Sequence, residues 1–263
     1  SAAFISYLNS QISTNATYLK SMMSVSNVSN TGFVWGFDSG SEYFNGLAKD
    51  ETLYLSYVVK VSDGTATVDK TISILIQGTN DIVAISSYDN TTDDSSLNYN
   101  DNPQNIESQT SSLTRTGTIS YANLDLSDTV STYTNIKNIV YEKRGILSEL
   151  TSDQVNILGS GFYTSINTST NTVSWEYSTT QNNLYFLGAG ETVTATMEVS
   201  VSDGKGSTVS HDVVITLVGK NNAPVISESS SGSSTVTYQE TNAAFNTTLN
   251  VLDISDKNIY DLV

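Results

Sequence analysis

The 263-residue chain contains no cysteine, so it has neither a disulfide framework nor a cysteine-ligated zinc site. Its hydrophobic residues, 38% of the total, suffice for a core without cross-links. No apolar run approaches the ~20 residues of a membrane span, so we expect no membrane insertion. The opening residues, SAAFISYLNS, lack an initiator Met and a charged signal-peptide head. We therefore expect a piece of a longer or processed protein.

Basic residues are also scarce. Against 27 Asp and Glu stand only 11 Lys and Arg, which gives a formal charge of −16. Such a chain repels polyanions, so we expect nucleic acids and anionic membrane surfaces to be poor partners. Divalent cations, in contrast, are attracted to it.

Signatures of catalysis are missing as well. The chain has a single histidine, His211, and holds no G-x-S-x-G, H-E-x-x-H or phosphate-cradling glycine loop. Acidic pairs such as Asp50 and Glu51 could in principle serve a glycosidase. Glu51, however, recurs as Glu191 in the repeat described next, which indicates a scaffold residue. We expect a protein that is not an enzyme.

One segment of the chain occurs twice, with similar sequences. Residues 58–81, VVKVSDGTATVDKTISILIQGTND, match residues 199–222, VSVSDGKGSTVSHDVVITLVGKNN. Asp203 follows Asp63 by 203 − 63 = 140 residues, and Gly219 follows Gly78 by 219 − 78 = 141 residues. The second copy therefore has one extra residue in the turn of its hairpin, an insertion that a β-hairpin tolerates.

Apolar and polar residues alternate within each copy, which predicts strands with one buried face. The DG dipeptides predict the turn of a hairpin. The predicted inward positions are Leu53, Leu55, Tyr57, Val59, Val61, Ile72, Ile74 and Ile76 in the first copy, and Val193, Ala195, Met197, Val199, Val201, Val213, Ile215 and Leu217 in the second. Trp35 and Trp175 also occupy equivalent places, and we expect both in the core.

A second, weaker repeat relates GTISYANLDLSDT to NTTLNVLDISDKN. Asp253 follows Asp125 in this alignment by 253 − 125 = 128 residues. It predicts three segments: residues 1–85 as the C-terminal part of a first repeat, 86–227 as a complete repeat and 228–263 as the N-terminal part of a third. Helical spacing in residues 145–158 and 2–12 predicts a short helix within a repeat. The stretch SSYDNTTDDSSL, residues 86–97, is expected to be a linker.

The segments LYLSYVVKVSDGTATVDKTISILIQGTND and GETVTATMEVSVSDGKGSTVSHDVVITLVGKNNAPVI resemble the closing half of the VCBS-type repeat. That repeat is a cadherin-like or Ig-like β-sandwich found in tandem in large bacterial surface adhesins, including RTX adhesins, and LDLSDT resembles its opening half. The resemblance implies an all-β chain of tandem Ig/cadherin-like sandwiches with a short inserted helix. It also implies secretion to the bacterial cell surface.

Acidic clusters fall where such units would meet, and calcium is their candidate cofactor because it binds six to eight oxygen ligands. The alternative is that Asp and Asn simply favour turns. Asp63 and Asp203 are expected to be turn residues. In the second linker Asn222 stands where the first has Asp81, so the first should bind calcium better. The candidate metal ligands are Asn80, Asp81, Asp125, Asp128, Asp253 and Asp256.

Two functions are compatible with these features. The first is a calcium-stiffened, non-catalytic spacer of an adhesin, in contact with neighbouring repeats of the same protein during surface attachment or biofilm formation. The second is a self-assembling subunit of an extracellular filament, sheath or surface layer. In this second case, head-to-tail association would complete sandwiches between neighbouring chains.

Overall fold

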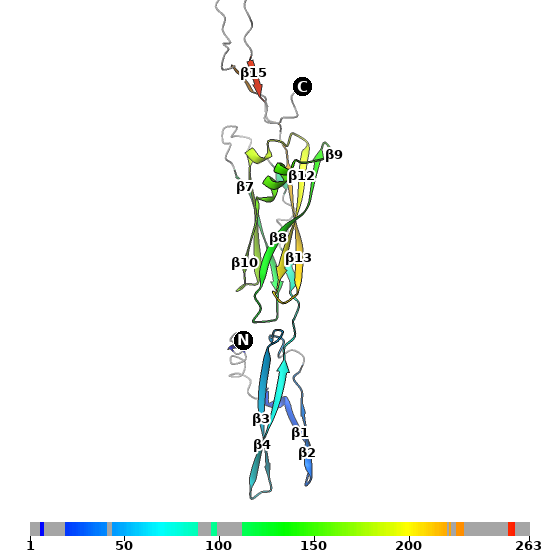
Figure 1. The fold of residues 1–263 in the computed structure, drawn as a ribbon, viewed down its shortest axis with the longest axis vertical. Coiled ribbons are helices and arrows are strands. Elements are labelled where there is room, and N and C mark those ends of the chain that lie inside the picture. The colour runs from blue at the N-terminus through cyan, green and yellow to red at the C-terminus, as the bar shows by residue number, and fades with distance from the viewer. Residues whose placement is uncertain are drawn as a thin grey trace, which may run out of the picture.

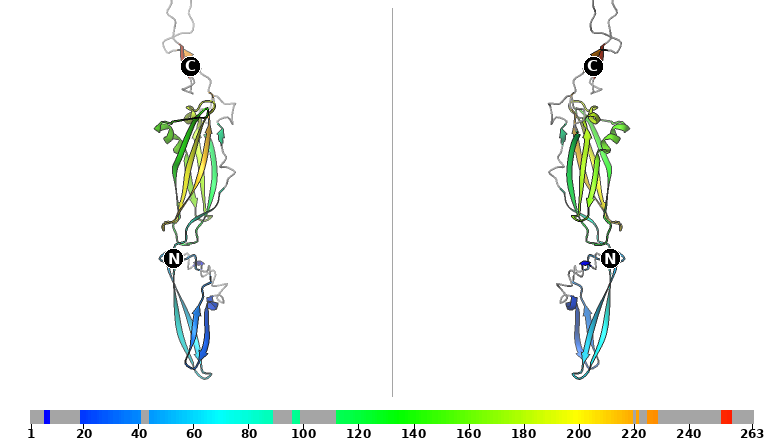
Figure 2. Two further views of the ribbon diagram at one scale, coloured as in Figure 1. Left: turned by 90° about the vertical axis from the view of Figure 1, so that its right-hand side faces the viewer. Right: turned by 90° about the vertical axis from the view of Figure 1, so that its left-hand side faces the viewer.

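The computed structural model describes residues 6–7, 19–40, 44–88, 96–98, 112–219, 221, 225–228 and 252–255. These residues form units arranged end to end in an elongated rod (Figure 1), an order that both side views preserve (Figure 2). The first unit contains strands β1 (Met23–Ser29), β2 (Gly32–Phe37), β3 (Thr52–Ser62) and β4 (Thr67–Gln77). The third contains β14 (Val225–Glu228) and β15 (Leu252–Ser255).

The second unit is a β-sandwich of two sheets. Its strands are β5 (Ala84–Tyr88), β6 (Ser96–Asn98), β7 (Ser112–Ala122), β8 (Ser131–Lys143), β9 (Ile146–Ser148), β10 (Phe162–Asn167), β11 (Thr172–Thr180), β12 (Glu191–Ser202) and β13 (Thr208–Val218). One sheet has the order β10-β11-β7-β5 and the other the order β6-β13-β12-β8-β9. Apart from the parallel pair β13–β6, neighbouring strands are antiparallel. This strand order is that of an immunoglobulin-like sandwich, so the predicted all-β fold class is confirmed.

The core of the second unit lies between these two sheets. Alternate residues of β12 and β13 are fully buried, as the period-two pattern predicts, and they face Ile119, Val173, Trp175 and Tyr177 of the opposite sheet. Phe162 stacks on Trp175 with ring centroids 5.9 Å apart. Removing this apolar surface from water is the main source of the unit's stability.

A short helix, α2 (Ser152–Gly159), follows β9 inside the second unit. The Thr151 hydroxyl accepts from the Gln154 backbone N–H at 3.3 Å, and the Gln154 side chain accepts from the Thr151 N–H at 2.8 Å. A short helix is present as predicted, but residues 146–148 of the predicted span form strand β9, and the capping box explains why the helix begins only at Ser152. Of the second predicted helix, residues 2–12, only residues 6 and 7 are described, and both are helical. Within the described residues, no helix is long and apolar enough to cross a membrane.

The two copies of the repeated hairpin have the same register. Thr52 pairs with Gln77 in the first and Thr192 with Val218 in the second. The extra residue lies in the turn of the second copy, as predicted. The Asp63 N–H donates to the Ala66 carbonyl, three residues on, at 3.3 Å, whereas the Asp203 N–H donates to the Ser207 carbonyl, four residues on, at 3.2 Å.

A glycine ends each copy of the hairpin where backbone segments pack closely. A Cβ on Gly78 would lie 2.2 Å from the Ala48 carbonyl oxygen, and a Cβ on Gly219 would lie 2.2 Å from the Gly188 carbonyl oxygen. Only glycine fits either position without moving the backbone.

The first unit is built differently from the second. Its hairpins β1–β2 and β3–β4 are separate two-stranded sheets, because no described strand takes the places that β7 and β8 hold beside β11 and β12. Trp35 is consequently 46% exposed, whereas Trp175 is 2% exposed. The prediction of a core tryptophan is therefore correct for Trp175 and wrong for Trp35.

The segment expected to be a linker, residues 86–97, is also partly wrong. Residues 86–88 belong to β5, which pairs with β7, and residues 96 and 97 belong to β6, which pairs with β13. The many Ser, Asn and Asp residues hid these strands, because strand pairing at a sheet edge does not require an apolar sequence.

The two tryptophans give a matched test of this difference. Trp175→Ala is expected to lower the free energy of unfolding of the second unit by about 3–5 kcal/mol, because it empties a core position. Trp35→Ala should cost less than about 1 kcal/mol, as for other exposed side chains. Urea denaturation followed by far-UV circular dichroism measures both, and equal losses would contradict the assignment.

Candidate metal centre at the junction of two units

The linker between the first and second units runs from Gly78, after β4, to Val83, before β5. Its first residue is held by the first unit, since the Gly78 N–H donates to the Glu51 carbonyl at 2.8 Å. Its last residue is held by the second unit, since Val83 is 3% exposed and belongs to the sandwich core. The residues between them are therefore fixed at both ends.

Three hydrogen bonds attach the linker to the near end of the second unit. The Asn80 amide donates to Asp203 Oδ2 at 3.0 Å. The Asp81 backbone N–H donates to Asp125 Oδ2 at 2.8 Å. The Val83 N–H donates to the Ser207 hydroxyl at 3.2 Å. Two loops supply the acceptors, one after β7 and one between β12 and β13.

Local geometry positions the acidic side chains of these loops. After β7 the chain turns so that the Asp128 N–H reaches the Asp125 carbonyl at 3.4 Å, and the Asn123 amide donates to Asp128 Oδ2 at 3.3 Å. In the other loop Asp203 Oδ1 accepts from the N–H groups of Lys205 at 2.7 Å and Ser207 at 3.0 Å. We call the resulting group the junction cluster: Asn80, Asp81, Asn123, Asp125, Asp128 and Asp203.

Four oxygen atoms of the junction cluster are buried without a hydrogen-bond partner. A buried polar atom of this kind is costly, since each lost hydrogen bond leaves a desolvation penalty of about 1–3 kcal/mol. Asp125 is the extreme case: the residue is 4% exposed, and one of its carboxylate oxygens has no donor. The four atoms are Asn80 Oδ1, Asn123 Oδ1, Asp125 Oδ1 and Asp128 Oδ1.

The concentration of negative charge shifts the pKa values of two carboxyl groups. Burial raises the pKa of Asp125 to about 6, and the charges of Asp128, Asp81 and Asp203 act in the same direction against the hydrogen bond from the Asp81 N–H. Burial also raises the pKa of Asp128, opposed by the Asn123 hydrogen bond. In both groups the surroundings therefore favour the protonated form over the charged one.

Asp203 behaves in the opposite way. Burial pushes its pKa up, but the hydrogen bonds from Asn80 and from the backbone N–H groups of Lys205 and Ser207 outweigh burial and leave the pKa lowered. Asp203 therefore supplies a stable negative charge beside the two strained carboxylates.

Glu51 contributes charge from the first unit, although its principal contact is structural. Its carboxylate accepts from the Ala48 N–H at 3.1 Å, just as the equivalent Glu191 accepts from the Gly188 N–H at 3.1 Å. Glu191 also receives the Tyr141 hydroxyl at 2.7 Å. Both residues thus brace the same turn, as expected for scaffold residues. The charge of Glu51 adds to the upward shift of the Asp128 pKa.

The donors of the junction cluster are carboxylate and amide oxygens, which are the ligands that hard divalent cations prefer. The orphaned oxygens fit a cation chemically, since a positive ion would satisfy them and lower the repulsion among the carboxylates. Within the described part of the chain, no three His, Asp or Glu side chains already form the tight grouping of a metal site. The cluster thus has suitable donor atoms, but its side chains are not grouped as closely as those of a metal site.

The structure brings four of the six candidate ligands together: Asn80, Asp81, Asp125 and Asp128. Asp253 lies elsewhere, within β15 and opposite Ser227. It is thus inside a strand, whereas the aligned Asp125 follows one. Asp256 and Asn222 lie outside the described residues.

Sequence reasoning missed two members of the junction cluster, Asn123 and Asp203. Asp203 does have the expected turn hydrogen bonds, but it also faces the linker. Its counterpart Asp63 is exposed, and among the described residues its carboxylate accepts from the Thr65 and Ala66 N–H groups, at 2.8 and 2.7 Å. The two share a sequence motif, and the contact of Asp203 with the linker residue Asn80 distinguishes them.

Comparisons with known proteins leave the family open. No family model and no curated protein sequence matches the chain. Among solved structures, a protocadherin gammaB4 extracellular domain aligns at 11% identity over 80% of this chain and 28% of its own length, with a TM-score of 0.31. A chicken T-cell receptor aligns at 11% identity over 66% of this chain and 96% of its own, with a TM-score of 0.20. At these scores the fold assignment depends on the strand order of the second unit alone.

The raised pKa of Asp125 gives a pH dependence that can be measured in metal-free protein. The folded group binds its proton near pH 6 and the unfolded one near pH ~3.9. Between these values the folded state holds more protons, so the stabilising contribution is complete below about pH 4 and is lost as the pH rises through 6. Asp125→Asn should therefore raise the thermal midpoint in EDTA at pH 7 and flatten its decline between pH 4 and pH 7.

Asp63→Asn is the control for this measurement, since the pKa of Asp63 is lowered by hydrogen bonds from the Ala66 and Thr65 N–H groups. It should not raise the midpoint at pH 7. An Asp125→Asn protein with the midpoint and pH profile of the parent would contradict the assignment.

Proposed function

We propose that this chain is a non-catalytic spacer from the extracellular part of a bacterial adhesin, and that Ca²⁺ bound by the junction cluster stiffens it. The observation that carries the calcium role is the set of four buried oxygens without partners, gathered where the linker meets the second unit. The end-to-end arrangement of the units supports the spacer role (Figure 1). The resemblance of the two hairpins to the VCBS-type repeat supports the adhesin assignment.

Ca²⁺ would act on this junction by neutralising it. Asp125, Asp128 and Asp203 offer charged oxygens, while Asn80 and Asn123 offer neutral ones. The carboxylates would close on the ion from loops that the linker already touches, so binding would restrict the linker between Gly78 and Val83. The ion would have a structural and not a catalytic role. It would cross-link two loops whose carboxylates repel one another without it.

The expected strength of this effect is modest. Calcium sites of extracellular modules have dissociation constants of about 10⁻⁴ to 10⁻³ M. Calcium at ten to a hundred times that value adds about 1.4–2.7 kcal/mol to the free energy of unfolding. Such a contribution fixes an orientation between units, while the second unit retains its own core without the ion.

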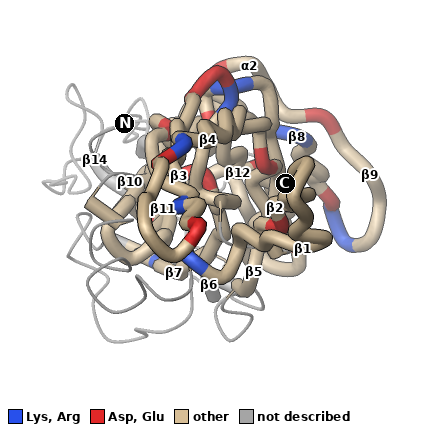
Figure 3. Tube along the Cα trace, turned by 90° about the horizontal axis from the view of Figure 1, so that it is seen from below, with Lys and Arg blue, Asp and Glu red and all other residues tan. Residues whose placement is uncertain are grey.

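The charge distribution agrees with this role. Acidic and basic positions are scattered around the described trace when it is viewed along the long axis, without a continuous basic face (Figure 3). With a formal charge of −16, the chain would attract Ca²⁺ from its surroundings.

Calcium binding is tested with the pair Asp203→Asn and Asp63→Asn, which change equivalent residues of the two copies. Isothermal titration of the parent should detect one site at this junction with millimolar or submillimolar affinity, and calcium should raise the thermal midpoint relative to EDTA. Asp203→Asn should lose most of both effects, because it removes a ligand charge. Asp63→Asn should keep both, because Asp63 lies in the first unit's hairpin turn, outside the junction cluster.

Small-angle X-ray scattering tests stiffening separately from binding. The maximum dimension and the flexibility of the parent should change between EDTA and millimolar calcium, and those of Asp203→Asn should not. Absence of heat together with an unchanged midpoint would remove the calcium role, and binding without a change in scattering would remove the stiffening role.

A further inference from the structure

The outer face of one sheet of the second unit carries an open groove. Its volume is about 560 Å³, within the range of about 300–1,000 Å³ that is usual for ligand sites. Three neighbouring strands, β10, β11 and β7, supply its lining through side chains that point away from the core. These six side chains are Tyr163, Ser165, Ser174, Glu176, Thr116 and Thr118.

Strand pairing arranges the six side chains in two rows across the sheet. In one row Glu176 is paired with Tyr163 on one side and with Thr116 on the other. The second row, two residues along, contains only hydroxyl side chains: Ser165, Ser174 and Thr118. Side chains directly opposite on neighbouring strands lie close enough to contact one ligand together.

The groove has a rigid base. Trp175 and Gly117 also line it, and Trp175 belongs to the core, where its ring stacks on Phe162. A Cβ on Gly117 would lie 2.4 Å from a carbon of the indole ring, so the ring packs directly against the backbone of β7. A site built on strands that the core holds in place loses little conformational freedom when a ligand binds.

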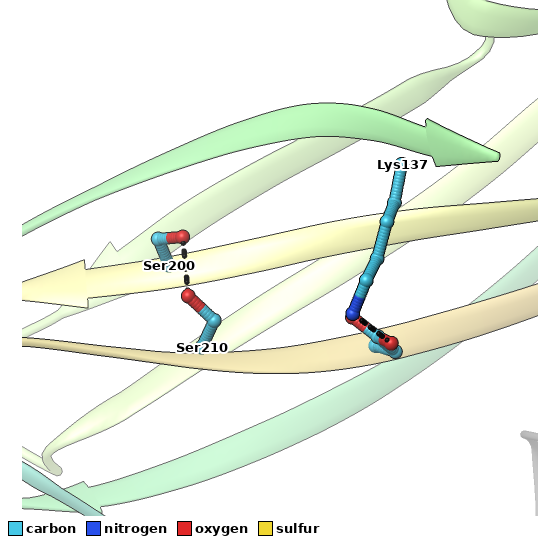
Figure 4. A network of polar contacts seen from close by, with 4 residues as sticks. Lys137, Ser200 and Ser210 are labelled. Carbon is cyan, nitrogen blue, oxygen red and sulfur yellow. Dashed lines mark hydrogen bonds and ion pairs between the residues drawn. The ribbon is translucent and has the colours of Figure 1, made fainter.

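The polar groups of the groove are available to a ligand. Within the described part of the chain, no hydrogen bond joins any of the six side chains to another protein group. On the opposite sheet, in contrast, polar side chains bond to one another. Lys137 of β8 bonds to Asp212 of β13 at 2.6 Å, and Ser200 of β12 bonds to Ser210 of β13 at 2.8 Å (Figure 4).

The aromatic and acidic residues of the groove are not part of the repeated scaffold. When the two tryptophans are aligned, Tyr163 and Glu176 correspond to Ser24 and Gly36 of the first unit. The strand pairing is the same in both units, so the fold does not require a tyrosine or a glutamate at these positions. Tyr163 is nevertheless 62% exposed, which costs apolar surface in water without stabilising the core.

We propose that this groove binds a segment of a neutral polysaccharide. The face of the Tyr163 ring is apolar and carries partial negative charge, so it suits the C–H groups on one face of a sugar ring. The Glu176 carboxylate would accept hydrogen bonds from sugar hydroxyls, and bonds to a charged acceptor are the stronger kind. The Ser and Thr hydroxyls both donate and accept, which matches the hydroxyls of a sugar.

Charge selects among polysaccharides. The lining contains Glu176 and no Lys or Arg, and the whole chain has a formal charge of −16. Acidic polysaccharides would therefore be repelled. The strands of the second unit run along the rod (Figure 1), so the groove lies on its side and not at the junction with a neighbouring unit.

Retention on immobilised polysaccharides tests this proposal. The panel contains the neutral polymers cellulose, chitin, dextran, mannan and β-1,3-glucan, with acidic alginate for comparison. The parent should bind at least one neutral polymer saturably and should not bind alginate. Tyr163→Ala and Glu176→Gln should each weaken that binding at least about tenfold, because each removes one of the two side chains specific to this unit.

Two exposed residues outside the groove provide matched controls. Tyr133→Ala, at a tyrosine of β8 that is 52% exposed, and Glu149→Gln should both bind as the parent does. Binding should also be equal in EDTA and in calcium, because the groove shares no residue with the junction cluster, so this proposal can fail independently of the calcium role. No retention on any neutral polymer, equal retention on alginate, or equal losses in the control variants would overturn the proposal.

Discussion

The hydrogen bond from the Asp81 backbone N–H to the Asp125 carboxylate fixes where the first unit ends and the second begins. It is short, 2.8 Å, and its acceptor is almost entirely buried. A charged acceptor in such a place strengthens the bond but repels its neighbours Asp128 and Asp203. The junction therefore holds its shape and at the same time concentrates negative charge, which Lys205 only partly offsets. The position of the candidate site follows from this combination.

Equivalent residues of the two copies behave differently because their neighbours differ. Trp175 packs against Phe162 and faces β7, whereas Trp35 is half exposed beside an open edge. Asp203 bonds to a linker, whereas Asp63 closes only its own turn. The sequence repeat reproduces the local hydrogen bonds of each hairpin faithfully. Burial and charge depend on segments that lie far away along the chain.

The sequence therefore predicts the local features of this structure better than its long-range contacts. The alternation along β12 and β13, the extra turn residue and the helix capped by Thr151 are local properties, and the structure confirms them. Candidate ligands Asn80, Asp81, Asp125 and Asp128 were found because Asn and Asp gathered at predicted strand ends. Asp203 was assigned to a turn, which is correct, but its second contact depends on how a linker docks 123 positions away in the chain.

The same distinction explains the remaining errors. Strands β5 and β6 were missed because their Ser-rich and Asn-rich sequences resemble loops, and their pairing is decided by the sheets they join. The exposure of Trp35 could not be read from its surroundings in the sequence, which are those of a core strand. Period-two patterns specify which face of a strand is apolar, but not whether another sheet covers that face.

The short strand β5 has a mechanical consequence for a rod that is pulled from its ends. Tension leaving the first unit through Gly78 passes along the linker and enters the second unit at Ala84, where β5 is held by only four residue pairs with β7. By contrast, β13 shares eleven pairs with β12 and would yield much later. The three linker hydrogen bonds lie ahead of β5 on the path of the force, so they take the load first. The junction cluster thus bears the load before the short strand β5 does, and an ion that tightened the cluster would protect the strand behind it.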